Sequence, residues 1–442
     1  EAISSYKTAI EINPKSCWYY AALGNAYVQQ ENLSEAIPCL IQALKMRPDY
    51  YDVHKKIEYI LKKQGIYEAA KLWETQEKLP QEWLRQFFNL TEDWEVTSDS
   101  PQTNITQINI YTNTEVNLLP TQTIDANFYR CFRATKVNSG KAFVAVVSEG
   151  KGSVDLGTTA VISSDNKLVR DLSTGCAEII LSSRELSPAH YIDGIVAFLS
   201  AKWGGNVYYH WMFDVVIRMD LLCRSGWTSK IDKFVFSKCD KKFHQETLEA
   251  LKIPQEKIIE SRFIPHIKAK KLVVPSFTIK QGGTRSPKWG CEFIRNLFLN
   301  SENICQISDQ SKGIFISRKL TSWRRVVNED EVVSLLEKFG FISLTLESFS
   351  VTEQAALMSK VRAVIAPHGA GLTNLVFCSP GTKVIEIFSP NYINIIYWQI
   401  SSLCHLSHYY LIGENFENDN SARQSWKPDI LVDLKKLVKI MK

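Results

Sequence analysis

The sequence predicts a helical repeat region followed by two α/β units. First, the pattern of residues 9–14 recurs at 43–48, displaced by 34 positions, which is the period of tetratricopeptide repeats. Second, strand and helix patterns alternate regularly between Gly313 and Phe388, as in a doubly wound parallel sheet. Third, a chain of 442 residues is too long for one ordinary core.

The repeat region is expected to span residues 1–88. Small and large apolar residues lie at the helical spacing that lets two antiparallel helices pack closely: Trp18, Ala22, Leu23, Tyr27, Ala36, Leu40, Ala43 and Leu44. A degraded third unit follows at 65–70. Because the chain opens in the second helix of a repeat, we expect an array cut from a longer one. A spacer and a concave surface that binds a protein or peptide both remain open for it.

Domain boundaries follow from changes in composition. Residues 89–124 are rich in Thr, Asn and Gln and read as a linker. We expect a first α/β domain at 125–281 and a second at 282–442, joined through Gly282 to Pro287.

The first α/β domain has a strand-rich entry and then a βα rhythm. Expected strands cover 143–147, 178–181, 234–237 and 272–274, and expected helices cover 208–222 and 244–251.

The second domain has a more regular pattern. Strands are expected at 313–317, 341–346, 363–366 and 383–388, and helices at 328–336, 351–359 and 372–377. Asn328 with Glu331, and Ser350 with Glu353, have the spacing of capping boxes at two helix starts.

Composition excludes several classes of protein. A net charge of +5 is too small to make nucleic acid the default partner. The sequence contains no uninterrupted run of about 18 apolar residues, so it predicts no membrane-spanning helix. Ten singly placed cysteines suggest buried thiols in a reducing compartment. We therefore expect a cytoplasmic protein, in which peripheral attachment to a membrane remains open.

The carboxyl ends of the second domain's strands carry a candidate anion site, because ligands of such sheets bind there. The glycines of a strand-to-helix loop let backbone N–H groups approach a phosphate, and the residues at the helix start add donors. Arginines nearby would neutralise a diphosphate. No Walker lysine is present, which disfavours nucleotide hydrolysis. The candidates are Ser317, Arg318, Arg324, Arg325, His368, Gly369, Gly371, Thr373, Asn374 and Glu386.

A second cluster lies on the expected helix 208–222. Asn206, His210, Asp214 and Arg218 recur every four residues and would form one polar stripe. Either Asp214 or His210 could take a proton from a substrate hydroxyl, each orienting the other. A solvated outer face is the alternative. The spacing does not suit a metal site.

These residues resemble a known family, glycosyltransferase family 61. The resemblance rests on several runs: Asn206 to Trp211 with Asp214, Ile316-Ser317-Arg318, Arg325, Asn328-Glu329, Glu353-Gln354, the run from Ala366 through His368 to Asn374, and Val384-Ile385-Glu386. It implies a GT-B architecture of two Rossmann-like domains and inverting transfer from a UDP-sugar to a glycan or protein acceptor. Bacterial relatives act in surface or capsular polysaccharide synthesis and often carry tetratricopeptide repeats.

The resemblance also implies roles for individual residues. Arg318, Arg325, Asn328, His368, Gly369, Gly371, Thr373, Asn374 and Glu386 would bind the donor; Asp214 and His210 would be catalytic; and Asn206 and Trp211 would lie on the acceptor side. No cofactor is expected. No metal is expected either, because the chain has no Asp-x-Asp element to carry one.

Two rival functions remain to be weighed. A nucleotide-sugar epimerase or dehydrogenase would need a G-x-G-x-x-G element after a strand, which the sequence lacks. An inactive transferase-like scaffold, whose repeats recruit a protein partner, would be favoured by loss of His368, Arg318 or Asp214. All three are present.

Overall fold

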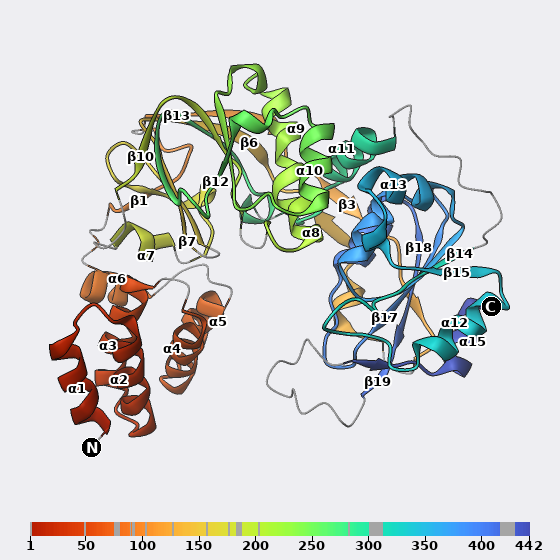
Figure 1. The fold of residues 1–442 in the computed structure, drawn as a ribbon, viewed down its shortest axis with the longest axis horizontal. Helices are drawn as coiled ribbons and strands as arrows, with labels where there is room; N and C mark the ends of the chain where they lie inside the picture. The colour runs from red at the N-terminus through yellow and green to blue at the C-terminus, as the bar shows by residue number, and fades with distance from the viewer. Residues whose placement is uncertain are drawn as a thin grey trace.

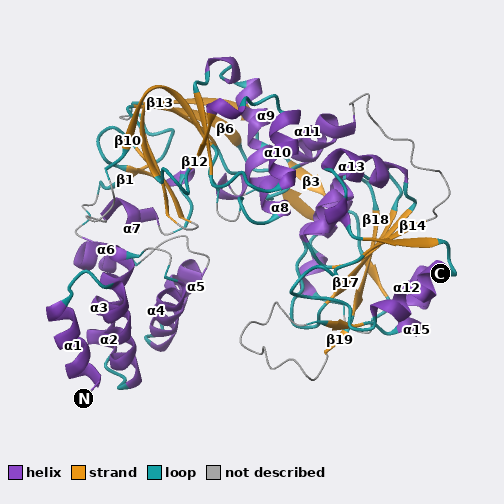
Figure 2. Ribbon diagram, viewed as in Figure 1, coloured by secondary structure: helices purple, strands orange, loops and turns teal. Residues whose placement is uncertain are grey.

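The computed structural model places the helical repeats at one end of the molecule and a second sheet at the other, with the first sheet between them (Figure 1). It describes residues 2–47, 50–74, 80–88, 90, 93–101, 104–125, 128–155, 158–175, 177–182, 188–201, 204–281, 283–299, 313–415 and 429–442. Figure 2 shows that the first region contains helices only, whereas both later regions combine strands and helices.

The repeats are antiparallel helix pairs, as the 34-residue period predicts. The helices are α1 (Ala2–Ile12), α2 (Cys17–Gln29), α3 (Leu33–Met46), α4 (Tyr51–Lys63), α5 (Tyr67–Glu74) and α6 (Gln81–Phe88). Asn32 caps α3 by accepting a hydrogen bond from the Glu35 amide. A Cβ on Gly24 would come within 2.7 Å of Leu40, so glycine lets α2 and α3 approach closely.

The repeat core continues into the next region. Buried Ala36, Leu40 and Leu44 belong to one apolar cluster with Ile162 and Ile180. Helix α7 (Ala177–Ser182) contacts α3 and α6. The repeats are therefore packed directly on the first sheet.

The first sheet combines antiparallel and parallel strands in the order β1-β9-β8-β7-β13-β10-β11-β12; β6 also pairs with β13, and β2 pairs with β6. The strands are β1 (Glu95–Val96), β2 (Ile105–Tyr111), β6 (Ala142–Ser148), β7 (Lys151–Asp155), β8 (Thr158–Ile162), β9 (Leu168–Val169), β10 (His190–Phe198), β11 (Lys233–Phe236), β12 (Ile258–Glu260) and β13 (His266–Pro275). The helical elements are η2 (Arg170–Leu172), α8 (Tyr208–Trp211), η3 (Met212–Val216), α9 (Arg218–Arg224), η4 (Thr228–Lys230), α10 (Lys242–Ala250), η5 (Gln255–Lys257) and η6 (Thr278–Gln281).

The second sheet is parallel throughout, in the order β15-β14-β16-β17-β18-β4. Its strands are β4 (Gln122–Thr123), β14 (Gly313–Ile316), β15 (Phe341–Leu344), β16 (Ala363–Pro367), β17 (Lys383–Phe388) and β18 (Ser407–Ile412). The helices are α11 (Lys288–Leu299), α12 (Glu329–Glu337), η7 (Leu346–Ser348), α13 (Val351–Lys360), η8 (Ala370–Phe377), α14 (Ile396–Leu403) and α15 (Leu434–Met441). Short pairs complete the fold: β3 (Glu115–Asn117) with β5 (Lys136–Asn138), and β19 (Glu414–Asn415) with β20 (Ile430–Leu431).

Helices cover both faces of the second sheet. Side chains of α12 and α15 pack with Phe315 and Ile385 on one face, and side chains of α13, η8 and α14 pack with Ile314 and Val384 on the other. Alternate residues of each strand point to opposite faces. The doubly wound arrangement expected from the sequence is therefore present.

The linker interpretation of residues 89–124 is wrong. Strands β1 and β2 pair with β9 and β6 of the first sheet, and β4 pairs with β18 of the second. The following 3-10 turn η1 (Arg130–Arg133) also belongs with the second sheet, since the Phe132 ring stacks on Tyr410 with centroids 4.6 Å apart. The segment thus crosses between the two sheets, and 125 is not a domain boundary.

Three local predictions are also corrected. Residues 178–181 lie in helix α7 and not in a strand. The loop helix η8 is a 3-10 helix. Asn328 does not cap α12; its side chain instead exchanges hydrogen bonds with the backbone of Val432. The Ser350–Glu353 capping box is present as predicted.

The two α/β regions share one apolar core. A single buried cluster joins Val216 and Phe236 of the first region to Leu375 and Tyr397 of the second. No helix in the described ranges is long and apolar enough to span a membrane. Cys131 and Cys223 are exposed, against the expectation that all thiols are buried.

Candidate functional site

A cluster of charged groups lies where the helix after β10 contains a π-helical turn. His210 lies in α8, and Asp214 lies in the π-helical turn η3 that follows it. Such π-turns inside helices frequently mark functional positions. His210 Nδ1 lies 2.6 Å from Asp214 Oδ2. Arg285 places Nη1 2.9 Å from the same carboxylate oxygen and 3.0 Å from His210 Nδ1.

The charges of this cluster decide its hydrogen bonding. Arg285 is a donor only and Asp214, as a carboxylate beside it, is an acceptor only. The shorter of the two contacts of His210 Nδ1, 2.6 Å to the carboxylate against 3.0 Å to Arg285, makes Nδ1 the donor to Asp214, and Arg285 donates to the same carboxylate. His210 Nε2 then keeps a lone pair. Nε2 makes no hydrogen bond to any described residue, and the His210 side chain is 23% exposed against 7% for Asp214. His210 is thus the more accessible of the two candidate bases, and Asp214 orients it.

The rest of the expected polar stripe does not face a substrate. Arg218 is buried and donates to the carbonyl oxygens of Phe198, Leu199 and Pro275, at the ends of β10 and β13. Burial lowers its pKa to about 9. Arg218 therefore joins the carboxyl ends of these two strands.

Of the two residues expected on the acceptor side, Trp211 differs from its expected role, whereas that of Asn206 stays a prediction. Asn206 lies in an exposed turn before α8, outside the helix. Trp211 is 1% exposed and donates from Nε1 to the Thr247 hydroxyl in the core. Trp211 therefore has no surface to offer an acceptor.

The second cluster surrounds the loop after β16. A Cβ on Gly369 would lie 1.8 Å from Nη1 of Arg318, so only glycine lets the Arg318 side chain cross this loop. Arg318 donates from Nε and Nη2 to the Trp323 carbonyl. Burial, with the nearby Arg324 charge, lowers the Arg318 pKa to about 10. Arg318 thus remains a cation at neutral pH.

Arg324 takes the place in the site that the sequence reading gave to Arg325. Its φ of +52° is a strained conformation for a residue with a side chain, and its guanidinium lies 5.0 Å from the Tyr392 ring centre. Its Nε is buried without a hydrogen-bond partner among the described residues. The Arg325 guanidinium instead donates twice to Asp429. The left-handed conformation of Arg324 itself directs the two adjacent side chains to different sides.

His368 and Glu386 form a buried pair at the carboxyl ends of β16 and β17. His368 Nδ1 lies 2.5 Å from Glu386 Oε1. Burial, followed by the charges of Arg324 and Arg318, holds the His368 pKa well below its ordinary value. Burial raises the pKa of Glu386 well above its own. Because Glu386 is fully buried, it cannot contact a donor and instead orients His368.

The Asn374 side chain connects the two α/β regions through hydrogen bonds, so its amide is not available as a hydrogen-bond donor to a ligand. Its Oδ1 accepts from the Tyr208 hydroxyl of α8, and its Nδ2 donates to Gln354 and to the Gly371 carbonyl. Thr373 is buried beside it. Gly371 lets η8 pack on β14, since a Cβ there would meet Ile316 at 3.2 Å.

The two clusters meet at Tyr397 of α14. Its ring lies 5.0 Å from His368 and 5.8 Å from Tyr209, which precedes His210. Burial raises the pKa of both tyrosines. The candidate base His210 and the cluster of Arg318, Arg324 and His368 therefore lie on either side of the Tyr397 ring. Arg285 and Tyr397 are functional candidates that the sequence did not indicate, whereas Arg324 was among the arginines expected to neutralise a diphosphate.

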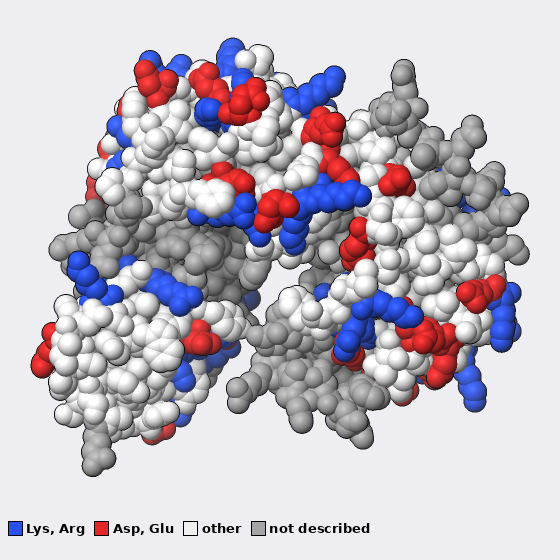
Figure 3. Space-filling view, in the orientation of Figure 1, with Lys and Arg blue, Asp and Glu red and all other residues white. Residues whose placement is uncertain are grey.

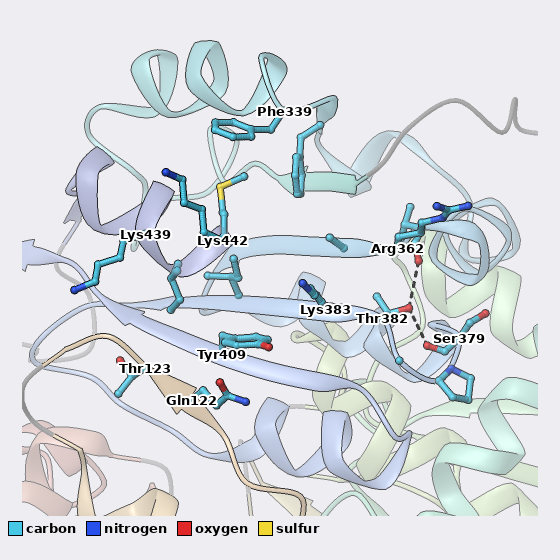
Figure 4. A pocket seen from close by; sticks show the side chains of 18 of the residues that line it. Gln122, Thr123, Phe339, Arg362, Ser379, Thr382, Lys383, Tyr409, Lys439 and Lys442 are labelled. Atoms are coloured by element: carbon cyan, nitrogen blue, oxygen red, sulfur yellow. Dashed lines mark hydrogen bonds between the residues drawn. The ribbon is translucent and has the colours of Figure 1, made fainter.

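A cavity at the second sheet lies away from both clusters. It measures about 1000 Å³ and is drawn in Figure 4, with Lys383, Lys439 and Tyr409 in its wall. Lys383 begins β17, whereas Glu386 and His368 lie near the opposite ends of their strands. This cavity is therefore not the candidate site.

Neither the charge distribution on the face in Figure 3 nor the possible metal ligands of the described residues indicate a further site. On the face in Figure 3, basic and acidic side chains are interspersed and form no single broad basic surface. Within the described ranges, no group of three or more His, Cys, Asp or Glu side chains has the arrangement of a metal site.

These features place the chain among α/β proteins with a ligand site at the carboxyl ends of the strands. The family model "Glycosyltransferase 61" matches residues 208–385, and a "TPR repeat" model matches residues 1–31. The chain thus carries a glycosyltransferase family 61 domain behind tetratricopeptide repeats. The matched range contains the first cluster and the second cluster as far as His368, whereas Glu386, Tyr392 and Tyr397 lie beyond it.

Three curated proteins show similarity over shorter segments. A rice (Oryza sativa subsp. japonica) β-1,2-xylosyltransferase is 34% identical over 88 residues, which cover 17% of this chain and 16% of the relative. A second rice β-1,2-xylosyltransferase is 36% identical over 81 residues, covering 18% and 17%. The EGF domain-specific O-linked N-acetylglucosamine transferase of Drosophila melanogaster is 33% identical over 78 residues, covering 17% and 15%. The chain thus matches about a sixth of each relative's length.

Proposed function

We propose that the chain is an inverting glycosyltransferase that moves a sugar from a UDP-sugar to a hydroxyl of a glycan or protein acceptor, in a GT-B-like pairing of its two α/β regions. One observation carries the proposal. The partly exposed His210, held by Asp214, follows Tyr209, whose ring contacts Tyr397. Arg318 and Arg324 face His368, whose ring contacts the same Tyr397. The relatives, whose names describe xylosyl or N-acetylglucosaminyl transfer, agree with this chemistry.

The mechanism follows from the two clusters. His210 Nε2 takes the proton of the acceptor hydroxyl as its oxygen attacks the anomeric carbon from the face opposite the nucleotide. Asp214 fixes the ring orientation and stabilises the imidazolium that forms. The bond between the anomeric carbon and the diphosphate breaks in the same step, so the configuration inverts.

The leaving diphosphate needs stabilisation of its growing negative charge. Arg318 and Arg324 supply two preorganised cations. Backbone N–H groups of the loop from Gly369 into η8 add dipoles. Because these groups suffice to offset the charge, we propose that no divalent metal takes part.

The donor class can be tested by thermal shift against UDP-, GDP-, CMP- and TDP-sugars, since a ligand that binds the native state raises the unfolding temperature. UDP compounds should stabilise the wild-type protein, and Arg318→Ala should lose most of this shift. Arg325→Ala is the matched control, because its guanidinium is bound to Asp429, and it should retain the shift. Equal stabilisation of the Arg318→Ala protein would contradict the assignment.

The acceptor and the cellular role are a further part of the proposal. Exposed aromatic side chains on the repeats, namely Trp18, Tyr51, Tyr59 and Tyr67, suit contacts with a macromolecular acceptor or its carrier protein. By analogy with the family's role in surface polysaccharide, we place the reaction in polysaccharide synthesis. Alanine variants at these positions should raise the KM for a macromolecular acceptor and leave UDP affinity unchanged; equal KM values would remove the repeats from acceptor binding.

A further inference from the structure

The segment that crosses between the sheets contributes a side chain to a buried chain of hydrogen bonds. Thr121, just before β4, places its hydroxyl oxygen 2.7 Å from His408 Nδ1. On the other side of the ring, His408 Nε2 lies 3.1 Å from Glu386 Oε2. Glu386 Oε1 in turn meets His368 Nδ1. Four side chains from four separate segments are thus linked, and all are at most 5% exposed.

The donors and acceptors of this chain can be assigned in order. The Thr121 hydroxyl has one proton and two acceptors within reach, His408 Nδ1 at 2.7 Å and the His408 carbonyl oxygen at 3.2 Å. The shorter contact assigns the proton to the bond with Nδ1, which places the His408 proton on Nε2. His408 Nε2 then donates to Glu386 Oε2. Only one contact remains to be assigned, between Glu386 Oε1 and His368 Nδ1.

The cost of burying charge restricts the last contact. A chain with Glu386 ionised and both histidines neutral is disfavoured, because burial of this carboxyl raises its pKa well above the ordinary value despite the nearby Arg324 charge. Two assignments avoid this: a protonated Glu386 that donates to His368, or an ionised Glu386 paired with a protonated His368. In both of them His368 has a proton on Nε2.

The neighbouring cations favour the first of these assignments, the protonated Glu386, because they disfavour a protonated His368 ring. Arg318 and Arg324 are the cations that face His368, and Tyr397 lies against its ring. Burial alone holds the His408 pKa at about 3, so His408 stays neutral and keeps its single proton. His368 Nε2 makes no hydrogen bond to any residue that the structure describes, so its donor is available to a ligand.

We infer that Thr121, His408 and Glu386 are positioning residues that hold His368 as a hydrogen-bond donor through Nε2, directed to the anionic diphosphate of the nucleotide donor. His368 is then a diphosphate-binding group and not a base. This inference rests on the proposed function for the identity of the ligand, whereas the protonation of His368 is independent of it.

The first test measures protonation. Nitrogen-15 NMR of the histidine rings in the full chain distinguishes a protonated from a bare ring nitrogen, and a His368→Gln variant assigns the signal. The inference expects a protonated Nε2 in the wild type without any ligand. A bare Nε2 would overturn it, whatever UDP does.

The second test measures binding of UDP by calorimetry. His408→Leu removes the donor to Glu386, and we expect UDP to bind about 10- to 150-fold more weakly, the loss of one hydrogen bond to a charged group. His408→Gln, whose amide can still donate to Glu386, should restore most of the affinity. Thr121→Val should weaken binding in the same direction, and Thr121→Ser should not.

One control variant separates positioning from general damage. His266→Leu removes another buried histidine, at the start of β13, and should leave UDP affinity unchanged. Unchanged affinity in a folded His408→Leu protein would overturn the inference. If UDP fails to bind the wild type while the NMR signal shows a protonated Nε2, the donor assignment fails and the positioning inference stands.

Discussion

Adding one methyl group at Gly369 tests the nucleotide-binding site without removing any charged group. The φ of Gly369 is 179°, an extended conformation open to any residue, so Gly369→Ala strains no backbone. The new Cβ, however, would lie 1.8 Å from Arg318 Nη1 and 2.8 Å from its Cζ. Since heavy atoms in contact lie about 3.5 Å apart, the guanidinium must move by roughly 1.5 Å, which breaks its hydrogen bonds.

The expected loss follows from that displacement. A hydrogen bond to a charged group contributes about 1.5–3 kcal/mol, so UDP should bind roughly 10- to 150-fold more weakly to Gly369→Ala. Titration calorimetry with UDP measures this directly. Gly371→Ala is the matched control in the same loop. Its Cβ meets Ile316 at 3.2 Å, which a small shift relieves, so its affinity should change by less than about threefold.

A double-mutant cycle then isolates the cause. In an Arg318→Ala background, Gly369→Ala should cost under about 0.5 kcal/mol, because the group that the methyl displaces is gone. Equal losses in both backgrounds would refute the reasoning and show that the loop backbone itself, and not Arg318, is what the glycine protects.

Three further predictions concern metal, stability and pH. Turnover should be unchanged in excess EDTA, and activity that is lost with chelator and restored by manganese would show that a metal holds the diphosphate. Phe132→Ala should lower the free energy of unfolding by about 3–5 kcal/mol, measured by urea denaturation; a loss below about 1 kcal/mol would mean that the crossing segment is not part of the second region's core. Burial lowers the His244 pKa to about 4, so the unfolded state binds the extra proton first and stability falls as pH drops from about 6.5 toward 4. His244→Leu should flatten this dependence, and an unchanged slope would assign it to other groups.

The second sheet was predictable because its signals are local. Its strands are short apolar runs separated by helices, and the Ser350–Glu353 box marks one helix start by side-chain chemistry alone. The His368–Asn374 loop was placed correctly at the end of β16 for the same reason. Local signals of this kind do not depend on what the rest of the chain does.

The errors arose where distant parts of the chain decide the structure. Strand β4 is polar and two residues long, and it exists because β18 offers an unpaired edge. The apolar run at 178–181 suits a strand or a helix equally, and packing against the repeats selects the helix. No local pattern distinguishes these outcomes.

The site shows the same division. The types of residue were found from the sequence, but their partners were not. Choosing between Arg324 and Arg325 depends on one left-handed residue and on Asp429, far along the chain. Asn374 carries the family motif, yet its amide is used to join α8 to η8. Arg285 lies in a predicted interdomain linker and nothing near it in sequence indicates its contact with Asp214.

The division of labour between the two clusters is the central claim, and one paired measurement tests it. UDP affinity by calorimetry and UDP release from the best donor sugar in the presence of acceptor are measured on Asp214→Asn, His210→Ala and Arg318→Ala. We expect the first two to bind UDP like the wild type while turnover falls about 10²- to 10⁴-fold. Arg318→Ala should bind UDP about 10- to 150-fold more weakly. Full turnover in both Asp214→Asn and His210→Ala, or wild-type UDP affinity in Arg318→Ala, would contradict the account.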